Sequence, residues 1–177
     1  MADDLAPEET ALVVVQAALA GRPGVLTTAR TLSHFGEHSA GWVGVSLLGA
    51  VVAPRRQRRQ WLAVGAGAFI AHAAAVVIKR VVKRQRPHHP AIAVNVGTPS
   101  KLSFPSAHAT STTAAAILLA RATGTRLPWL LIPVMALSRL VLGVHYPTDV
   151  LTGVAVGAVV ARSVVAVNEA GLKETEL

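Results

Sequence analysis

Five stretches of 17 to 19 residues, almost free of charged side chains, dominate the sequence. Only Arg139 and Arg162 carry a full charge within them, and the stretches cover residues 38–54, 61–78, 102–120, 127–144 and 150–167. A helix needs about 20 largely apolar residues to cross a bilayer. The chain is 52% hydrophobic with a mean hydropathy of +0.49, whereas a soluble domain needs more polar surface. The sequence therefore predicts an all-α fold, a multi-pass transmembrane helical bundle with about five spanning helices.

The N-terminal region differs from these stretches. Residues 10–21 are apolar but too short to cross a bilayer, and residues 23–37 mix charged with apolar side chains, which predicts an interfacial helix. A chain of 177 residues has the length of one domain, so we expect a single membrane-embedded domain. Its expected parts are an N-terminal interfacial region, a helical bundle core and a flexible tail, over residues 1–38, 39–168 and 169–177.

The charge balance is strongly basic, with 17 Lys and Arg against 9 Asp and Glu. A basic chain favours nucleic acid, anionic lipid headgroups or phosphorylated substrates as partners, and the high hydropathy argues against nucleic acid. The acidic start, with Asp3 and Asp4, is unlike the basic start of a cleavable signal peptide, so we expect the apolar segments to be retained. The sequence contains no cysteine, which excludes disulfides and thiolate metal sites.

The basic segment Lys79–Pro87 closes the second apolar stretch. Lys79 and Arg86 are seven positions apart, about 20° off one face of a helix, so both cations can contact one anion. Pro87 disfavours helical dihedrals at Arg86, which predicts that the helix ends there. The alternative is a basic helix end that anchors the chain to lipid headgroups.

Ser106 stands at a predicted helix N-cap, just before a long apolar run. The free amides of a helix N-terminus, including that of Ala107, bind phosphate together with the positive end of the helix dipole. Ser106 adds a hydroxyl donor, and His108 adds an acid/base group. The alternative is an ordinary capped helix that carries an interfacial histidine.

The segment Ser138–Asp149 places costly polar groups in an apolar stretch. A charge such as that of Arg139 costs at least about 2.5 kcal/mol within a membrane span, so it needs a partner or a polar cavity. His145 and Asp149 are four residues apart, and Pro147 suits the first turn of a new helix. The carboxylate can therefore accept from one imidazole nitrogen and orient the other, as in an activated base or nucleophile. The alternative is a turn with a polar cap.

Each of these three segments falls at the end of a predicted helix. The first closes the second span, the second opens the third, and the third closes the fourth and opens the fifth. In a bundle whose helices alternate in direction, these ends share one face of the membrane. We therefore expect three cations, two histidines, a serine and a carboxylate to surround one phosphate-binding site.

Together the three segments resemble the signature of the type 2 phosphatidic acid phosphatase superfamily. Its pattern is a Lys, six residues and Arg-Pro, then Pro-Ser-Gly-His, then Ser-Arg, five residues, His, three residues and Asp. The spacings match throughout Lys79–Asp149, and the one departure is Ala107 in place of the usual Gly. The resemblance implies a metal-independent phosphoric monoester hydrolase that acts on a lipid-linked phosphate and needs no cofactor.

The resemblance also implies roles for the matching residues. His145 would attack phosphorus to form a phosphohistidine, Asp149 would orient it, and His108 would protonate the leaving alkoxide. The phosphate oxygens would be held by Lys79, Arg86, Ser106, the Ala107 amide and Arg139.

Charge near the helix ends bears on the orientation in the membrane. The loops at residues 55–59 and 121–126 carry six Arg, and the opposite face carries a similar number of cations. Once Lys79 and Arg86 are discounted as catalytic, the positive-inside rule predicts an extracytoplasmic active site in the plasma membrane. The sequence gives no information on oligomeric state.

A narrower resemblance concerns the substrate. The Ser33–His38 stretch, the short length and the Ala/Val/Arg-rich composition resemble actinobacterial decaprenylphosphoryl-phosphoribose phosphatases. Such enzymes remove the ribose 5-phosphate from a polyprenyl-linked sugar and supply a precursor for cell-wall arabinan. A phosphatidylglycerophosphate, phosphatidate or polyprenyl-diphosphate phosphatase stays open, because catalytic motifs do not separate these enzymes. A non-catalytic scaffold that binds anionic lipid and a small transporter with a polar path along His72 and Arg139 also stay open.

The other histidines carry weaker signals. His34 and His38 have the i, i+4 spacing of a metal pair, with Glu37 beside them, but no third ligand of matching geometry is evident. We interpret these three residues as an interfacial face near the active site, and His72 as a packing residue. Two further histidines in the long loop can face either substrate or solvent, His88 and His89.

Overall fold

The computed structural model describes residues 5–173, and their secondary structure is helical apart from turns and loops. The α-helices are α1 (Pro7–Leu19), α2 (Val25–Gly36), α3 (Ala40–Val52), α4 (Arg58–Val82), α5 (Ala107–Thr123), α6 (Leu131–Val141) and α7 (Pro147–Lys173). Short 3₁₀ helices lead into α3, α4 and α6, namely η1 (Glu37–Ser39), η2 (Arg55–Gln57) and η3 (Leu127–Leu130). The prediction of an all-α fold is confirmed.

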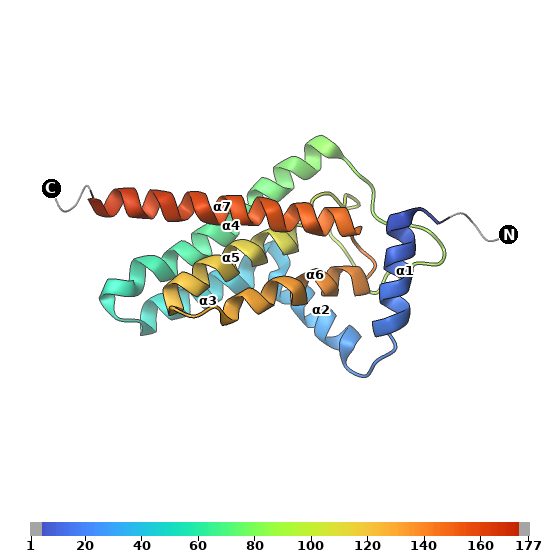
Figure 1. The fold of residues 1–177 in the computed structure, drawn as a ribbon, viewed down its shortest axis with the longest axis horizontal. Coiled ribbons are helices and arrows are strands. Elements are labelled where there is room, and N and C mark those ends of the chain that lie inside the picture. The colour runs from blue at the N-terminus through green and yellow to red at the C-terminus, as the bar shows by residue number, and fades with distance from the viewer. Residues whose placement is uncertain (1–4, 174–177) are drawn as a thin grey trace.

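Helices α3, α4, α5 and α7 run side by side along the long axis of the molecule (Figure 1). Helix α5 is central, because it packs against α4, α6 and α7. Ala114 of α5 is buried in a core that includes Val64 of α4 and Ala161 of α7. Small side chains allow close approach: a Cβ on Gly157 of α7 would lie 2.3 Å from the Thr110 carbonyl oxygen of α5. Such packing of small residues is typical of helices that associate in lipid.

Two helical segments of the described chain are long and apolar enough to cross a membrane, Arg55–Val82 and Pro147–Ala170. The other predicted spans form shorter helices. Helix α3 has 13 residues and α5 has 17, and the apolar segment Leu127–Val141 is also shorter than 18 residues. Helix α5 begins only at Ala107, because the first residues of the predicted span at 102–120 form the loop that leads to its N-cap. Large apolar side chains are exposed on the outer faces, as expected for contact with lipid.

The N-terminal region contains two helices where we predicted one interfacial helix. Helix α1 lies across the end of the bundle (Figure 1) and buries Leu12 completely. Gln16 holds it there, because its side chain donates to the carbonyls of Ala93 and Val141 at 2.7 and 3.1 Å. Helix α2 follows a turn at Gly24, whose φ of 80° is easily adopted only by glycine. The short apolar segment at residues 10–21 therefore belongs to a packed helix, because it has partners in the long loop and at the end of α6.

The C-terminal end is more helical than predicted. The tail expected to be flexible from residue 169 belongs to α7 as far as Lys173, while residues 174–177 lie outside the described part of the chain. Glu169 accepts from Arg121 of α5 at 2.6 Å, between two exposed side chains. The helix thus continues past the apolar stretch because its next turn still contacts the bundle.

Candidate active site

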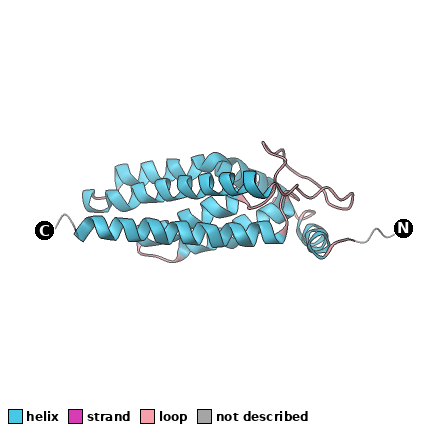
Figure 2. Cartoon of the chain, turned by 90° about the horizontal axis from the view of Figure 1, so that it is seen from above, coloured by secondary structure: helices cyan, strands magenta, loops and turns pink. Residues whose placement is uncertain are grey.

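The three sequence segments meet at one end of the bundle. The ends of α4 and α6 and the starts of α5 and α7 lie together beside the long loop, at the end opposite the C-terminus (Figures 1 and 2). A cavity of about 450 Å³ opens there. Six of the predicted site residues line it, Lys79, Arg86, Ala107, His108, Arg139 and His145. Ser106 and Asp149 lie behind this lining and are fully buried.

Lys79 and Arg86 reach the cavity from different elements, so the prediction that one helical face carries both is wrong. Helix α4 ends at Val82, and Lys83 adopts a left-handed conformation with a φ of 55°. Its N–H donates to the Lys79 carbonyl at 3.0 Å, which closes the last turn before Pro87 can influence it. Arg86 then lies in a loop that folds back over the helix end.

Backbone carbonyls hold both cations in place. Lys79 Nζ donates to the carbonyls of two adjacent loop residues at 2.9 and 3.1 Å. Arg86 donates through Nε to the Ser100 carbonyl at 2.8 Å and through a terminal nitrogen to the Val144 carbonyl at 2.6 Å. Burial lowers the pKa of Arg86 to about 10, against the opposing effect of Asp149. The guanidinium therefore stays charged at neutral pH.

The second segment forms the predicted helix N-terminus. Ser106 is the N-cap of α5, and its hydroxyl accepts from the Ala109 N–H at 3.4 Å. His108 lies in the first turn with its Nε2 at 2.9 Å from the Ser33 carbonyl oxygen of α2. Because a carbonyl can only accept, Nε2 carries the proton in this contact and Nδ1 is the basic nitrogen. Helix α2 thus sets the tautomer and direction of His108.

Arg139 lies within α6 and is 1% exposed. Its guanidinium donates to the hydroxyl groups of Ser138 and Ser33 at 3.1 and 3.0 Å, and to the Ala29 carbonyl at 3.3 Å. These partners are neutral, so they satisfy the donors without cancelling the charge. Arg139 was expected to have either a partner or a polar cavity, and it has both. Its charge is available to an anion in the cavity.

His145 and Asp149 are both buried and close together, but they are not hydrogen-bonded as predicted. His145 Nδ1 lies 3.7 Å from Asp149 Oδ2, which is too long for a hydrogen bond, and Nδ1 has no other partner among the described residues. Asp149 Oδ2 instead accepts from the Tyr146 N–H at 2.8 Å, at the start of the helix that Pro147 opens as predicted. The carboxylate therefore caps α7 and faces the imidazole at the same time.

The other nitrogen of His145, Nε2, points into the cavity. It lies 3.3 Å from a terminal nitrogen of Arg86. Burial holds the pKa of His145 well below its ordinary value, and the positive charges of Arg86, Lys79 and Arg139 add to this effect. The imidazole is therefore neutral at neutral pH, with a lone pair available for attack on an electrophile.

Sequence reasoning missed Arg84, which links the site to α1. Arg84 donates to Asp149 Oδ1 at 3.0 Å and to Glu8 of α1 at 2.5 Å, and its guanidinium lies 4.0 Å above the Tyr146 ring. The second oxygen of Glu8 accepts from the Thr148 N–H and hydroxyl at 3.1 and 2.6 Å. The buried carboxylate thus has its cation on the side away from the imidazole. No local pattern could reveal a contact between residues so far apart in the chain.

We expect Arg84→Gln to lower kcat about tenfold or more and to lower the thermal midpoint in detergent. Asp149 is fully buried and would then lose its cation, and a buried charge without a partner destabilises the folded state. The matched control is Arg121→Gln, whose pair with Glu169 is 56% exposed on both sides, since exposed pairs contribute about 0–1 kcal/mol. Phosphate release and unfolding curves measure the difference, and equal behaviour of the two variants would contradict this role.

Sequence reasoning also missed the contact of Gly36 with His108. A Cβ on Gly36 would lie 2.7 Å from His108 Cδ2 and 3.5 Å from Met135 Cε. A larger residue must therefore displace the imidazole or the end of α2. The sequence marked this stretch only through a resemblance, because nothing in its own pattern shows that it contacts a histidine 72 positions further along the chain.

Gly36→Ala is expected to lower kcat by about 10- to 100-fold while the protein stays folded, because a displacement of about 1 Å at a reacting group can cost about 10²-fold in rate. The backbone itself tolerates alanine, since φ at Gly36 is −82°. Gly44→Ala is the control, because a Cβ there meets nothing within 4 Å. Phosphate release and size-exclusion elution in detergent test the pair; full activity in Gly36→Ala would show that the contact is unimportant.

The remaining polar residues fall into two groups. His34, Glu37, His38 and His72 line the cavity, whereas His88 and His89 do not. The placement of the first three agrees with their interpretation as a face near the site. His72 was predicted as a packing residue and instead lines the cavity, because its position on α4 shares a face with Lys79. Among the described residues, no group of three or more His, Asp or Glu is arranged to hold a metal ion.

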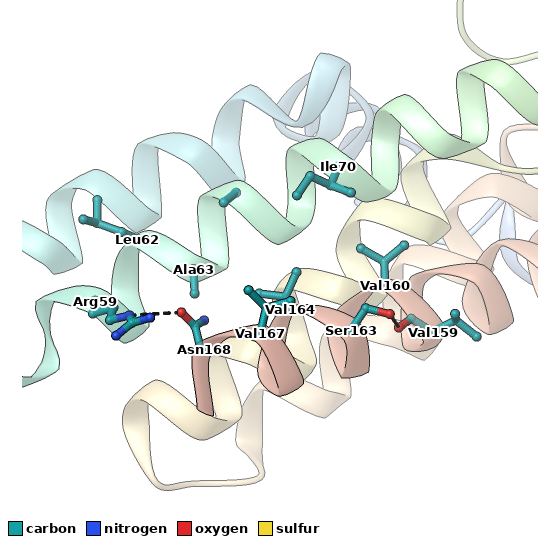
Figure 3. Close-up of a pocket in the computed structure, with 11 residues that line it drawn as sticks. Arg59, Leu62, Ala63, Ile70, Val159, Val160, Ser163, Val164, Val167 and Asn168 are labelled. Atoms are coloured by element: carbon teal, nitrogen blue, oxygen red, sulfur yellow. Dashed lines mark hydrogen bonds between the residues drawn. The ribbon is translucent and has the colours of Figure 1, made fainter. Parts of the chain in front are cut away.

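A larger hollow of about 600 Å³ lies between α4 and α7, near the end that carries Arg59 and Asn168 (Figure 3). Arg59 donates to the Asn168 side chain at 3.2 Å and closes one end of it. The rest of the lining is nearly all apolar, including Ile70 of α4 and Val164 of α7. An apolar lining suits hydrocarbon rather than phosphate, so the cavity at the loop end is the candidate for chemistry.

This cavity can hold a tetrahedral anion between two imidazoles. Three cations and the N-terminus of α5 supply positive charge and donors, which is what phosphoryl transfer chiefly requires. This is the arrangement that a lipid phosphatase in a helical membrane protein would need. The model of the PAP2 superfamily matches residues 60–171, which include all three segments, and the chain belongs to this superfamily.

Relatives of known activity are similar over most of the chain. The chain is 74% identical over 153 residues to decaprenylphosphoryl-5-phosphoribose phosphatase of Mycolicibacterium smegmatis, covering 86% of this chain and 84% of that protein. It is 68% identical over 157 residues to the protein of the same name from Mycobacterium tuberculosis, covering 89% and 88%. The resemblance inferred from the three segments is thereby confirmed.

Two crystal structures share the fold. The transmembrane PAP2-type phosphatidylglycerolphosphate phosphatase of Bacillus subtilis matches with a TM-score of 0.71 at 21% identity, covering 94% of this chain and 88% of that chain. LpxE of Aquifex aeolicus matches with a TM-score of 0.64 at 19% identity, covering 94% and 99%. The chain therefore has the fold of transmembrane PAP2 phosphatases and is a membrane protein.

Proposed function

We propose that the chain hydrolyses the 5-phosphate monoester of decaprenylphosphoryl-5-phosphoribose and leaves decaprenylphosphoryl-ribose, a step toward the cell-wall arabinan precursor. The observation that carries the proposal is the cavity that His145 and His108 share with three cations. The choice of substrate is supported by the 74% identity to the enzyme of that name. Because that similarity spans most of both chains, it includes the cavity and the helices around it.

In the first step, His145 Nε2 attacks phosphorus and the bond from phosphorus to the ribose 5-oxygen breaks. His108 carries a second proton, on Nδ1, in the substrate complex. It gives this proton to the leaving oxygen and becomes neutral, and the products are a phosphohistidine and the ribose hydroxyl. Asp149 faces the Nδ1–H of His145, so it stabilises the positive charge that develops on the ring. In the structure, a terminal nitrogen of Arg86 lies 3.3 Å from His145 Nε2. The guanidinium turns toward the phosphate when the substrate binds.

In the second step, His108 takes a proton from water as the water oxygen attacks phosphorus. The bond between phosphorus and Nε2 breaks, inorganic phosphate leaves, and both histidines return to their starting protonation states. Lys79, Arg86 and Arg139 hold the phosphate oxygens with the amides at the α5 N-terminus, among them that of Ala107. The Ser106 side chain is fully buried, so its role is to cap α5 and hold these amides in place rather than to contact the phosphate.

The substrate panel tests the proposal. Purified protein in detergent with a chelator is given decaprenylphosphoryl-5-phosphoribose, phosphatidylglycerophosphate, phosphatidate and a polyprenyl diphosphate, and phosphate release is measured. We expect the highest kcat/KM with the ribose lipid, no effect of the chelator, and no release by a His145 variant. A higher kcat/KM with another lipid would assign the chain to that substrate. Transport or binding of these lipids without hydrolysis would show that the chain is not a phosphatase.

We further propose that five segments cross the membrane and that the cavity faces the extracytoplasmic side. The crossings are α3, α4, α5, η3 with α6, and α7; the shorter helices cross with the residues that flank them, or where the bilayer is locally thinner. The arginine-rich loops at 55–59 and 121–126 lie at the end opposite the cavity, which supports this orientation.

Single cysteines introduced at Gln57 and Lys101 test this orientation, since the chain has no cysteine of its own. An impermeant thiol reagent on intact cells should label only position 101, and labelling of position 57 alone would reverse the orientation.

A further inference from the structure

We infer that His38 and His72 form a second anion subsite in the catalytic cavity, which binds the phosphodiester between the sugar and its lipid tail. This inference rests on the proposed function, because it assumes a substrate with both a phosphate monoester and a phosphodiester. Both residues line the same cavity as His145 and His108, and the mechanism above uses neither of them. The ring centroids of His38 and His72 lie 5.8 Å apart.

The position of His72 along α4 suits the more deeply placed of two phosphates. His72 precedes Lys79 by seven residues, which places it on nearly the same face and about 10 Å further from the loop end of the helix. The monoester is held at Lys79, where the bundle meets the surface. In a lipid substrate the phosphodiester lies nearer the tail and therefore deeper in the membrane. A pentose between the two groups would fill the space between the two ends of the cavity.

His72 has an unused hydrogen-bonding atom. Its Nδ1 is buried and has no partner among the described residues. A buried polar atom without a partner is costly, and it normally has a partner in some state of the protein. When Nδ1 carries the proton, its N–H can donate to a phosphate oxygen.

The backbone around His38 is strained in a way that presents this side chain to the cavity. His38 and Ser39 both have left-handed conformations, with φ of 50° and 57°. This conformation is unfavourable for a residue other than glycine, and such strain is frequently found at functional sites. Ser39 is fully buried and donates to the His38 carbonyl at 2.6 Å, which stabilises the turn. The turn therefore holds the His38 ring opposite the α4 face that carries His72.

A pair of matched lipids tests the subsite. Both carry the same polyprenyl tail and ribose 5-phosphate, but one has the natural phosphodiester link and the other a neutral glycosidic ether. We expect the double variant His38→Ala/His72→Ala to lose about 10- to 100-fold in kcat/KM on the phosphodiester lipid, mainly through KM, as for lost hydrogen bonds to a charged group. The ether lipid should be cleaved by the variant and the original protein at nearly the same rate. The control is His88→Ala/His89→Ala, outside the cavity, which should not distinguish the lipids.

A second variant guards against a folding defect. His38 is exposed on a turn, and aspartate tolerates the left-handed conformation, so His38→Asp should fold and should repel the phosphodiester. We expect it to discriminate between the lipids at least as strongly as the alanine variant. Equal losses on both lipids in His38→Asp, or no loss on either, would overturn the inference.

Failure of the proposed function gives a different result. If phosphatidylglycerophosphate is the better substrate, the function is wrong, but that lipid also carries a phosphodiester beside its monoester. The same variants are then compared on phosphatidylglycerophosphate and phosphatidate, which lacks the diester. Selective loss on the former supports the subsite, and equal loss rejects it.

Discussion

His145→Gln should abolish phosphate release, with a loss in kcat greater than the 10²- to 10⁴-fold typical of one acid/base group. The variant removes the atom that forms the bond to phosphorus in the proposed mechanism. Glutamine is chosen because it is similar in size and can donate to Asp149. Release of phosphate from radiolabelled lipid, followed over hours, gives the lower limit of the loss.

The same variant should still fold and bind. The cations that hold the phosphate stay in place, so we expect substrate to protect the variant from thermal unfolding as it protects the original protein. His88→Gln, in the loop outside the cavity, is the matched control and should keep full activity. A phosphorylated protein that is stable to alkali and labile to acid should form in the original protein and not in His145→Gln. A variant that retains measurable turnover and the phosphorylated species would exclude His145 as the nucleophile.

His108→Gln should lower kcat on the lipid substrate by about 10²- to 10⁴-fold, because an alkoxide is a poor leaving group without a proton donor. With p-nitrophenyl phosphate, whose leaving group needs no proton, the first step should be affected much less. The second step still lacks its base, so the phosphohistidine should accumulate. Rapid-quench measurement of the burst and of the labelled protein separates the two steps.

The comparison between the two substrates makes this prediction specific. A structural defect would reduce both rates equally and would not trap an intermediate. Loss of the contact at 2.9 Å between His108 Nε2 and the Ser33 carbonyl can be examined separately by Gly36→Ala, which leaves the imidazole present but displaced. If His108→Gln slows both substrates alike and no phosphorylated protein accumulates, His108 is not the acid and base.

Local features were predictable because they depend on neighbouring residues. Ser106 precedes an apolar run with the chemistry of an N-cap, and Pro147 suits a first helical turn; both helices begin where these residues indicate. The helix end at Arg86 was predicted wrongly from Pro87. Lys83 ends the helix earlier, in a left-handed conformation that is not favoured by its own residue type and is stabilised by the loop packed over it.

Contacts across long sequence separations were not predictable. The ion pair between Arg84 and Glu8 joins residues 76 positions apart, and the contact of His108 with Ser33 joins residues 75 positions apart. Each depends on how α1 and α2 lie across the end of the bundle. These two helices looked like peripheral interfacial segments, because their composition does not reveal what they cover.

The sequence by itself determined that the chain forms apolar helices and that its histidines, cations and carboxylate lie at helix ends, because hydropathy and spacing act along the chain. It also determined the superfamily, since those spacings are specific. Only the tertiary structure decided that Asp149 pairs with Arg84 and that His72 lines the cavity. It also decided that Ser33 of α2 contacts both His108 and Arg139. The physical reason is that hydrogen bonds and burial depend on distances in space, which the packing of the helices sets.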